Sequence, residues 1–213
     1  PINAQDGTGG NPLLLPMELI ESIDILKGPS SLFYGSDAVG GALNLKPRKF
    51  NSPTVRLGYE SENKPSLFLG SPILKKEKHY LQGTIYFDTS DGDFKYNDPT
   101  LGETKRKNNN RKKQRYSLVG ENKFSKTTLS HNFIYAHEEG TSPGSIYFPS
   151  ITEFNRNAFL GAVHVKQKIN SSLNANYKIS HSRTDDDNTE GGTKTNYFTT
   201  KTLHSLSADY QVA

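Results

Sequence analysis

The chain has 213 residues, of which 32% are hydrophobic, and its mean hydropathy is −0.71. No apolar run approaches the roughly 20 residues of a membrane-spanning helix, so a helical membrane protein is excluded. The formal net charge of +4 is modest, and the absence of cysteine fits a secreted or outer-membrane protein without disulfides. The 11 tyrosines and 11 phenylalanines at low hydropathy suit a membrane β-barrel, although a soluble β-sandwich could share this composition.

The first 19 residues predict a loop that returns to apolar ground. Residues 3–12 are polar and rich in glycine, and Leu13, Leu14 and Leu15 follow. The chain begins at Pro1 and has one methionine, Met17, so we expect a fragment or a processed chain. No signal peptide is visible, and export is therefore an inference.

Residues 20–45 are the most informative stretch of the sequence. Apolar and acidic residues alternate over 20–26, which predicts a short strand. Gly28 and Pro29 break that strand, because proline lacks an N–H and glycine adopts backbone angles closed to other residues. A compact run over 30–38 follows, and Gly40 and Gly41 then allow two backbones to approach closely before the chain extends again.

This stretch resembles the end of the plug domain of TonB-dependent outer-membrane receptors. The family pattern has the form I-E-x-I-E-V-L-[RK]-G-P-x-S-x-L-Y-G-x-x-A-x-G-G-x-I-N-I. The matching positions are Ile20, Glu21, Ile23, Asp24, Leu26, Lys27, Gly28, Pro29, Ser31, Tyr34, Gly35, Ala38, Gly40, Gly41 and Asn44. The form of residues 34–41 is most similar to the cobalamin and haem/colicin receptor branch, while Lys27 stands where arginine is commoner. The alternatives are a glycine-rich loop of a soluble β protein and a phosphate-binding loop, and the latter lacks its Gly-Lys-Ser/Thr ending.

The resemblance implies two domains, residues 1–49 as the C-terminal part of a plug and residues 50–213 as the first strands of a barrel. It implies that Lys27, Gly28, Pro29, Tyr34, Gly35, Gly40, Gly41 and Asn44 shape the plug. It also implies that the preceding loop faces the extracellular vestibule. By that position, the candidate substrate contacts are Asn3, Gln5, Asp6, Thr8 and Asn11. Residues 46–49 are expected to be a basic hinge at the periplasmic mouth.

From residue 53 the pattern becomes regular and predicts eight strands. They are 53–61, 66–73, 78–89, 114–124, 127–137, 157–168, 171–183 and 200–213, each close to the roughly 9–11 residues of a tilted membrane strand. In 171–183, Leu173 and Tyr177 share a face opposite Asn174 and Lys178. In 127–137 the alternation is less clean, because His131 interrupts the apolar face. Charged residues on the second face argue against a dry sandwich core and favour a wet lumen.

The connections between these strands predict their orientation. After the first pair, long and short connections alternate, as in barrels with short periplasmic turns and longer outer loops. This places 62–65, 90–113, 138–156 and 184–199 outside, and 74–77, 125–126 and the turn near Asn170 in the periplasm. Eight strands cannot enclose a plug, so we expect the first third of a 22-stranded antiparallel transmembrane β-barrel.

Two charged clusters are candidate binding sites. The basic run at 105–115 lacks interleaved aromatics, so a solvated outer loop is preferred to a nucleic-acid site, with lipopolysaccharide phosphates or an anionic substrate as other partners. Asp185, Asp186 and Asp187 form an acidic cluster that could hold calcium, although exposed loop acids are the default. The six histidines lie on separate predicted strands, and a haem receptor could use one as an iron ligand.

The sequence therefore predicts a transport protein and not an enzyme. By resemblance, it would be a monomer of the Gram-negative outer membrane that imports siderophore-bound iron, haem or cobalamin without a resident cofactor. TonB, with ExbB and ExbD, would supply energy through an N-terminal segment outside this chain. A passive porin or adhesin barrel is the main alternative. A soluble β-sheet protein with a nucleic-acid loop is the second.

Overall fold

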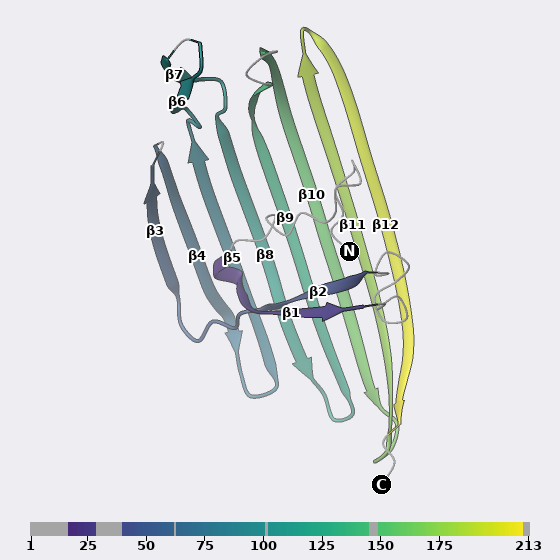
Figure 1. The fold of residues 1–213 in the computed structure, drawn as a ribbon. Helices are drawn as coiled ribbons and strands as arrows, with labels where there is room; N and C mark the ends of the chain where they lie inside the picture. Colours follow the sequence, from purple (N-terminus) through teal and green to yellow (C-terminus); the bar gives the residue numbers. More distant parts are fainter. Residues whose placement is uncertain (1–16, 29–39, 62, 101, 145–148, 211–213) are drawn as a thin grey trace.

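In a computed structural model, the structure describes residues 17–28, 40–61, 63–100, 102–144 and 149–210, which are almost entirely β-strand (Figure 1). After a single 3-10 turn, η2 (Met17–Leu19), the strands follow in order: β1 (Ile20–Lys27), β2 (Gly41–Pro47), β3 (Thr54–Glu60), β4 (Lys64–Lys75), β5 (His79–Ser90), β6 (Phe94–Asp98), β7 (Gly102–Arg106), β8 (Arg111–Lys123), β9 (Thr127–Gly144), β10 (Pro149–Lys168), β11 (Leu173–Glu190) and β12 (Thr193–Tyr210). Among these residues no helix is long and apolar enough to span a membrane.

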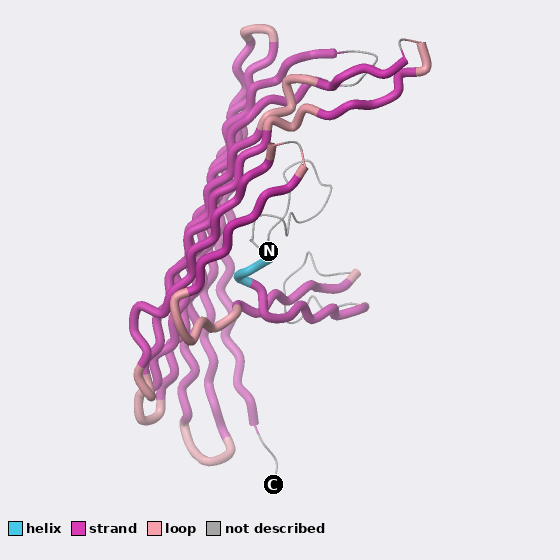
Figure 2. The backbone as a smooth tube through the Cα atoms, turned by 90° about the vertical axis from the view of Figure 1, so that its left-hand side faces the viewer, coloured by secondary structure: helices cyan, strands magenta, loops and turns pink. Residues whose placement is uncertain are grey.

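Eight strands form one antiparallel wall in the order β12-β11-β10-β9-β8-β5-β4-β3. Each strand pairs with its neighbour along the chain, except that the separate β6–β7 hairpin is inserted between β5 and β8. β1 and β2 form a second antiparallel hairpin, which extends away from one side of the wall with its open end nearest to the wall (Figure 2). A partial barrel wall that carries part of a plug is the predicted fold class, and it is confirmed.

The two faces of the wall differ because successive side chains on a strand point to opposite sides. We call the side that carries β1 and β2 the plug face, and the other side the outer face. One cross-strand row of the outer face runs through Leu69, Ile85, Tyr116, Tyr135 and Phe159. The neighbouring row of the plug face is listed from β4 to β10: Phe68, Tyr86, Arg115, Ala136 and Ala158.

The exposure of side chains on the two faces is unlike that of a soluble protein, because polar residues are buried on one face and large apolar residues are exposed on the other. The buried wall residues belong to the plug face and include polar ones: Phe68, Gln82, Thr84, Arg115, Ser117, Val119, Ile134, Ala136 and Ala158. Large apolar residues of the outer face are open, among them Tyr177, Tyr210 and Leu206, which is 79% exposed. A sheet with lipid on one side and a polar interior on the other has this arrangement.

At one end of the wall the strands are joined by short turns, as predicted. Backbone hydrogen bonds close the turns between Lys76 and His79 and between Phe124 and Thr127. In the third turn, the side-chain oxygen of Asn170 accepts hydrogen bonds from the Ser172 and Leu173 amides, both at 2.9 Å. Asparagine favours turns because its side chain can satisfy the backbone locally.

At the opposite end two of the predicted long loops are wrong. Residues 138–144 and 149–156 belong to β9 and β10, and residues 184–190 and 193–199 belong to β11 and β12. The connection from β11 to β12 is the two residues Gly191 and Gly192, with φ of 56° and 82°. Two positive φ angles are what a tight hairpin turn of type I′ requires, and glycine adopts them without steric cost.

The parts of β9 to β12 that the sequence pattern missed, at the end of the wall opposite the short turns, have no apolar face. Charged and amide side chains pair across the strands there instead. Arg156 pairs with Asp186 on the neighbouring strand. On the opposite neighbour of β11, Asn196 of β12 donates a hydrogen bond to Asp187 at 2.6 Å. Opposite charges and polar pairs placed across two strands stabilise a sheet that is wet on both faces.

The predicted outer loop at 90–113 contains the β6–β7 hairpin. At the top of the wall the hairpin leans toward the side that carries β1 and β2 (Figure 2). The Arg106 guanidinium donates to the backbone oxygens of Pro143 and Gly144, which ties the hairpin to β9. The basic run is thus divided between β7 and β8, and Lys105, Arg111 and Lys112 pair with Asp93, Glu138 and Glu139.

Candidate functional site

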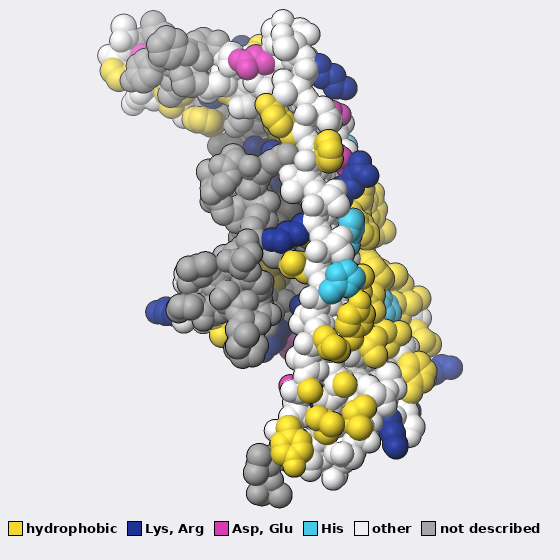
Figure 3. All heavy atoms as spheres, turned by 90° about the vertical axis from the view of Figure 1, so that its right-hand side faces the viewer, with side chains coloured by type: hydrophobic (Ala, Val, Ile, Leu, Met, Phe, Trp, Pro, Cys, Tyr) yellow, Lys and Arg dark blue, Asp and Glu magenta, His cyan; other side chains and the backbone are white. Residues whose placement is uncertain are grey.

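The outer face carries an apolar band that has a polar border. Seen from the β12 edge, apolar side chains gather on the side of the wall away from β1 and β2, with histidines among them (Figure 3). His131 is one of the histidines of this face, and its ring stacks on Phe133 with the centroids 5.7 Å apart. His131 therefore lies in line with the apolar residues on the outer face of β9, although it interrupts their pattern in the sequence.

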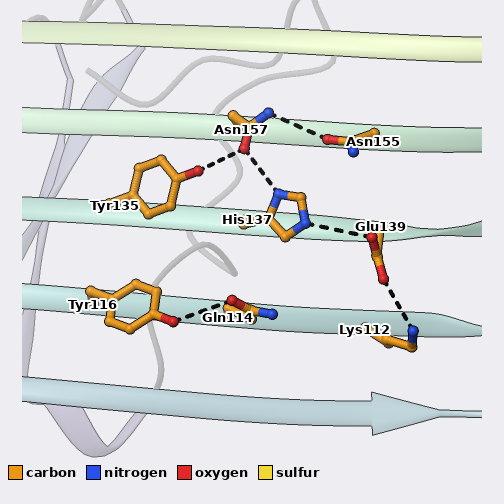
Figure 4. Close-up of polar contacts among 8 residues, drawn as sticks. All are labelled: Lys112, Gln114, Tyr116, Tyr135, His137, Glu139, Asn155 and Asn157. Atoms are coloured by element: carbon orange, nitrogen blue, oxygen red, sulfur yellow. Dashed lines mark hydrogen bonds and ion pairs between the residues drawn. The ribbon is translucent and has the colours of Figure 1, made fainter.

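The border lies at Tyr116 and Tyr135, where the hydroxyls turn toward polar neighbours (Figure 4). Tyr116 donates to Gln114 at 3.2 Å, and Tyr135 donates to Asn157 at 2.8 Å. His137 lies 2.9 Å from the same Asn157 oxygen. Tyrosine is enriched where a barrel passes from hydrocarbon to water, because its ring is apolar and its hydroxyl is polar.

Beyond the border, several charges pair with one another. Lys112 and Glu139 are 3.1 Å apart, and Glu139 also lies 3.7 Å from His137. Arg183 pairs with Asp185 at 2.9 Å on the same strand. The outer face thus has apolar residues below the tyrosines and pairs of opposite charge above them.

On the plug face, the signature residues of the β1–β2 hairpin form a small polar cluster. Asp24 lies opposite Asn44 in the register of the hairpin, and Asn44 donates to its carboxylate at 3.2 Å. Lys46 contacts the same oxygen at 2.9 Å. The hydrogen bond from Lys46, followed by that from Asn44, lowers the pKa of Asp24 below its ordinary value.

The lowered pKa fixes the pH range in which this cluster holds the hairpin together. A depressed pKa in the folded state means that the stabilisation is present above the ordinary pKa of an aspartate. It is lost as pH falls through the lowered pKa of Asp24, so the cluster is intact at neutral pH. The asparagine of the signature is therefore a hydrogen-bond donor to the acidic residue across the hairpin.

Two signature glycines have backbone conformations that suit glycine. Gly28 ends β1 with φ of 91°, and Gly41 begins β2 with φ of 138°. A Cβ on Gly41 would lie 2.3 Å from the carbonyl oxygen of Leu26, so the predicted close approach is confirmed there. A Cβ on Gly40 would meet nothing within 4 Å among the described residues, so the close approach that the structure shows is made by Gly41.

The predicted basic hinge leads directly into a joint with the wall. Here the amide of Phe50 donates to the Tyr80 hydroxyl at 2.8 Å and to the Gln82 side-chain oxygen at 3.0 Å. The Tyr80 hydroxyl also donates to the Phe50 carbonyl at 2.9 Å. Gln82 uses its amide nitrogen to donate to the Arg48 carbonyl at 2.7 Å. The Arg48 amide in turn donates to the Leu19 carbonyl at 2.7 Å, so both ends of the hairpin meet at this point.

Packing reinforces the same joint. The Phe50 ring lies 5.8 Å from the Phe68 ring, and a Cβ on Gly70 would stand 2.9 Å from the tip of Phe50. Phe68 is 1% exposed and Gln82 is 0% exposed, and they are the two largest fully buried side chains of the described residues. The sequence pattern gave no sign of this, since Gln82 looked like any polar residue of the second face.

A hollow of about 750 Å³ opens on the plug face near the upper ends of β9 to β12. Its lining comprises Arg111, Glu138, Ser142, Thr152, Phe154, Arg156, Asn188, Glu190, Thr193, Thr195 and Tyr197. Arg111 pairs with Glu138 at 3.1 Å, and its guanidinium lies 5.7 Å from the centre of the Phe154 ring. Charged, amide and aromatic groups therefore share one concave surface.

Other predicted site residues are only partly covered by the structure. Asn3, Gln5, Asp6, Thr8, Asn11, Pro29, Tyr34 and Gly35 lie outside the described residues. Lys27 is exposed at the end of β1. Asp185, Asp186 and Asp187 lie in β11 and not in a loop, with Asp186 on the plug face and the other two on the outer face. Within the described ranges, no cluster of three or more acidic or histidine side chains could hold a metal ion.

Comparison with known proteins agrees with the geometry. Residues 1–42 match the family described as the TonB-dependent Receptor Plug Domain. The chain is 36% identical over 69 residues to the "Vitamin B12 transporter BtuB" of Vibrio vulnificus, a match that covers 31% of this chain and 11% of that protein. It is 50% identical over 36 residues to the "Iron-regulated outer membrane virulence protein" of Vibrio cholerae, covering 17% and 6% of the two chains. It is 43% identical over 47 residues to the "Probable TonB-dependent siderophore receptor PirA" of Acinetobacter baumannii, covering 22% and 6%.

The matched segments span about a tenth or less of these relatives. The plug-domain match at residues 1–42 includes β1 and the start of β2, and the strands that follow have the two-faced pattern of a barrel wall. Residues 1–42 are therefore a plug segment of the TonB-dependent receptor family, whose matched members are outer-membrane receptors of Gram-negative bacteria.

Proposed function

We propose that this chain is the end of the plug and the first third of the barrel of an active importer. The complete receptor would carry a scarce large solute across the outer membrane: siderophore-bound iron, haem or cobalamin. TonB, with ExbB and ExbD, would supply the energy through an N-terminal segment of the receptor. The observation that carries the proposal is the β1–β2 hairpin joined, through Arg48 and Phe50, to the polar face of a wall whose other face is apolar.

A plug seated in this way favours active transport over a passive pore. The lumen of a passive pore stays open to solutes, whereas the joint at Phe50 holds the hairpin inside the lumen. Import then requires a step that moves part of the plug aside. A passive porin or adhesin barrel is the alternative, and it has no need of such a step.

Uptake in paired strains tests the proposal. The full-length receptor is expressed in cells with and without TonB, and accumulation of radiolabelled cobalamin, haem and several ferric siderophores is measured. We expect one of these solutes to accumulate only when TonB is present. Equal uptake in both strains would favour the passive pore.

The hollow on the plug face is our candidate for part of the substrate surface, together with Asn3, Gln5, Asp6, Thr8 and Asn11 of the preceding loop. The volume of the hollow falls in the roughly 300–1,000 Å³ range of ligand sites. Its guanidinium, carboxylate and amide groups suit a polar solute with several hydrogen-bonding groups, and Phe154 and Tyr197 offer aromatic faces. Lipopolysaccharide contacts of the outer face are a secondary proposal, whereas Asp185 to Asp187 alternate between the two faces of β11 and do not form a calcium site.

Adjacent aromatic residues of β12 provide a matched test of this surface. Tyr197 lines the hollow, whereas Phe198 points to the outer face and is 67% exposed. We expect Tyr197→Ala to weaken binding of the imported solute about tenfold, a typical loss for a central aromatic contact. Phe198→Ala should leave the dissociation constant unchanged. Equal effects of the two substitutions in equilibrium binding to purified receptor would place the substrate elsewhere.

A further inference from the structure

The joint between plug and wall is the most tightly built place in the described part of the chain. Phe68 and Gln82 of the wall are the largest fully buried side chains of the described residues, and both belong to this joint. Both carbonyl and amide of Phe50 are engaged, and Phe50 itself is 5% exposed. Buried hydrogen bonds are costly to break without replacement, because the freed groups lose water as well as partners. A flexible hinge would have the opposite properties.

The joint also sits on a strand that cannot easily give way. Tyr80 and Gln82 belong to β5, which is hydrogen-bonded to β4 on one side and to β8 on the other. The chain continues from the joint into β3, which pairs with β4. A force on the plug that ran straight along the backbone would load β3 directly. The joint intercepts that force upstream of Thr54 and spreads it into β5.

Further contacts brace the same segment from both sides. Lys49 lies 5.6 Å from the centre of the Tyr80 ring and 3.6 Å from the Glu121 carboxylate. Lys75 reaches the side-chain oxygen of Asn51 at 3.1 Å. Each of residues 48 to 51 therefore contacts the wall, through backbone, ring or side chain.

We infer that Phe50, Tyr80 and Gln82 form a fixed anchor that keeps the C-terminal end of the plug on the wall throughout transport. The movement that opens a path then arises N-terminal to Arg48, and the plug does not leave the barrel as one rigid body. The three residues are positioning residues, since the inference gives them no contact with the solute. The inference rests on the proposed import function, and its experiment separates the two.

The test joins the anchor covalently in cells. The chain has no cysteine, so the double variant Asn51→Cys, Lys75→Cys can be bridged cleanly with a short, reducible bifunctional thiol reagent, provided that the rest of the receptor is also free of cysteine. TonB-dependent uptake by the unbridged variant reports on the proposed function. The ratio of bridged to unbridged uptake reports on the anchor, with the two single-cysteine variants as controls for the reagent. We expect a ratio near one. Loss of uptake on bridging that returns on reduction would overturn the anchor.

A second measurement does not depend on transport. Hydrogen exchange of the peptide that contains Phe50 is followed in purified full-length receptor in lipid. We expect protection comparable to that of β5, and exchange roughly tenfold faster in Gln82→Met, which keeps the bulk but loses the hydrogen bonds. Gln114→Met removes a glutamine of the outer face and should leave this peptide unchanged. Exchange at loop rates in the parent receptor would contradict a fixed anchor.

Discussion

Lysine in place of Phe133 is expected to destabilise the folded receptor by about 2–4 kcal/mol, the cost of a cation near the middle of the lipid face of a barrel. Phe133 lies on the outer face of β9, between the turn that ends at Thr127 and the polar border at Tyr135. Its ring is stacked with Phe159 on the next strand, with centroids 6.5 Å apart. An ammonium at this position would replace an apolar contact and meet hydrocarbon.

His137→Lys is the matched control for this prediction. It lies on the same strand and the same face, but above the tyrosines, beside Glu139. Near an interface the cost of a lysine falls to about 0–1 kcal/mol. The free energy of unfolding is measured by urea titration in phospholipid vesicles. Equal costs at the two positions would mean that the apolar band does not face lipid.

Alanine in place of Phe68 is expected to cost about 3–5 kcal/mol, as other buried phenylalanines do when they are truncated. Phe68 is 1% exposed, and its ring supports Phe50 at the joint. Gly70 packs against both rings and has no side chain that could fill the cavity left by Phe68. The loss should therefore appear both in the wall and in the seating of the plug.

Phe94→Ala is the comparison for Phe68→Ala. Phe94 lies in the β6–β7 hairpin, outside the main sheet, and is 38% exposed. Its truncation should change the stability of the wall by less than about 1 kcal/mol. Both variants are assayed by thermal unfolding and by protease digestion of the plug. An equal loss of stability in Phe94→Ala and Phe68→Ala, or a plug that stays protected from protease in Phe68→Ala, would contradict a structural role for the joint.

The sequence was informative where one face of a strand meets an apolar phase. In the lower half of β11 the alternation of Leu173, Asn174, Tyr177 and Lys178 predicted the faces correctly, because period two is visible when only one face is apolar. The same alternation located all eight strands of the wall. Residues 20–45 were sufficient for the family, since their order is specific.

The upper halves of the strands were missed for a physical reason. Above the tyrosines both faces are polar, so Asp185 to Asp187 carry no periodic signal and looked like a loop. Their strand structure depends on partners across the sheet, such as Arg156, which local pattern cannot supply. One available signal was overlooked: Gly191 and Gly192 form a two-residue hairpin turn, and such a pair marks a tight turn even between polar segments.

The joint could not have been predicted from the sequence. Gln82 and Phe50 are 32 positions apart, and neither stands in a motif. A polar residue on a lumen-facing strand has many uses, and only the fold brings this one against the backbone of the linker. The hollow lined by Tyr197 could not be predicted from the sequence either, because it is formed by the parts of β9 to β12 that the sequence pattern did not reveal.

The most direct test of the central claim is a nitroxide scan of β9 in the full-length receptor in lipid bilayers. Single cysteines from Leu129 to Ala136 are spin-labelled, and collisions with oxygen, which concentrates in the bilayer, are compared with collisions with a water-soluble nickel complex. The account predicts a period of two, with high oxygen accessibility at 129, 131, 133 and 135 and low oxygen accessibility at the positions between them. Uniform accessibility along the strand, or a maximum at the even positions, would contradict a wall that has lipid on one face and the plug on the other.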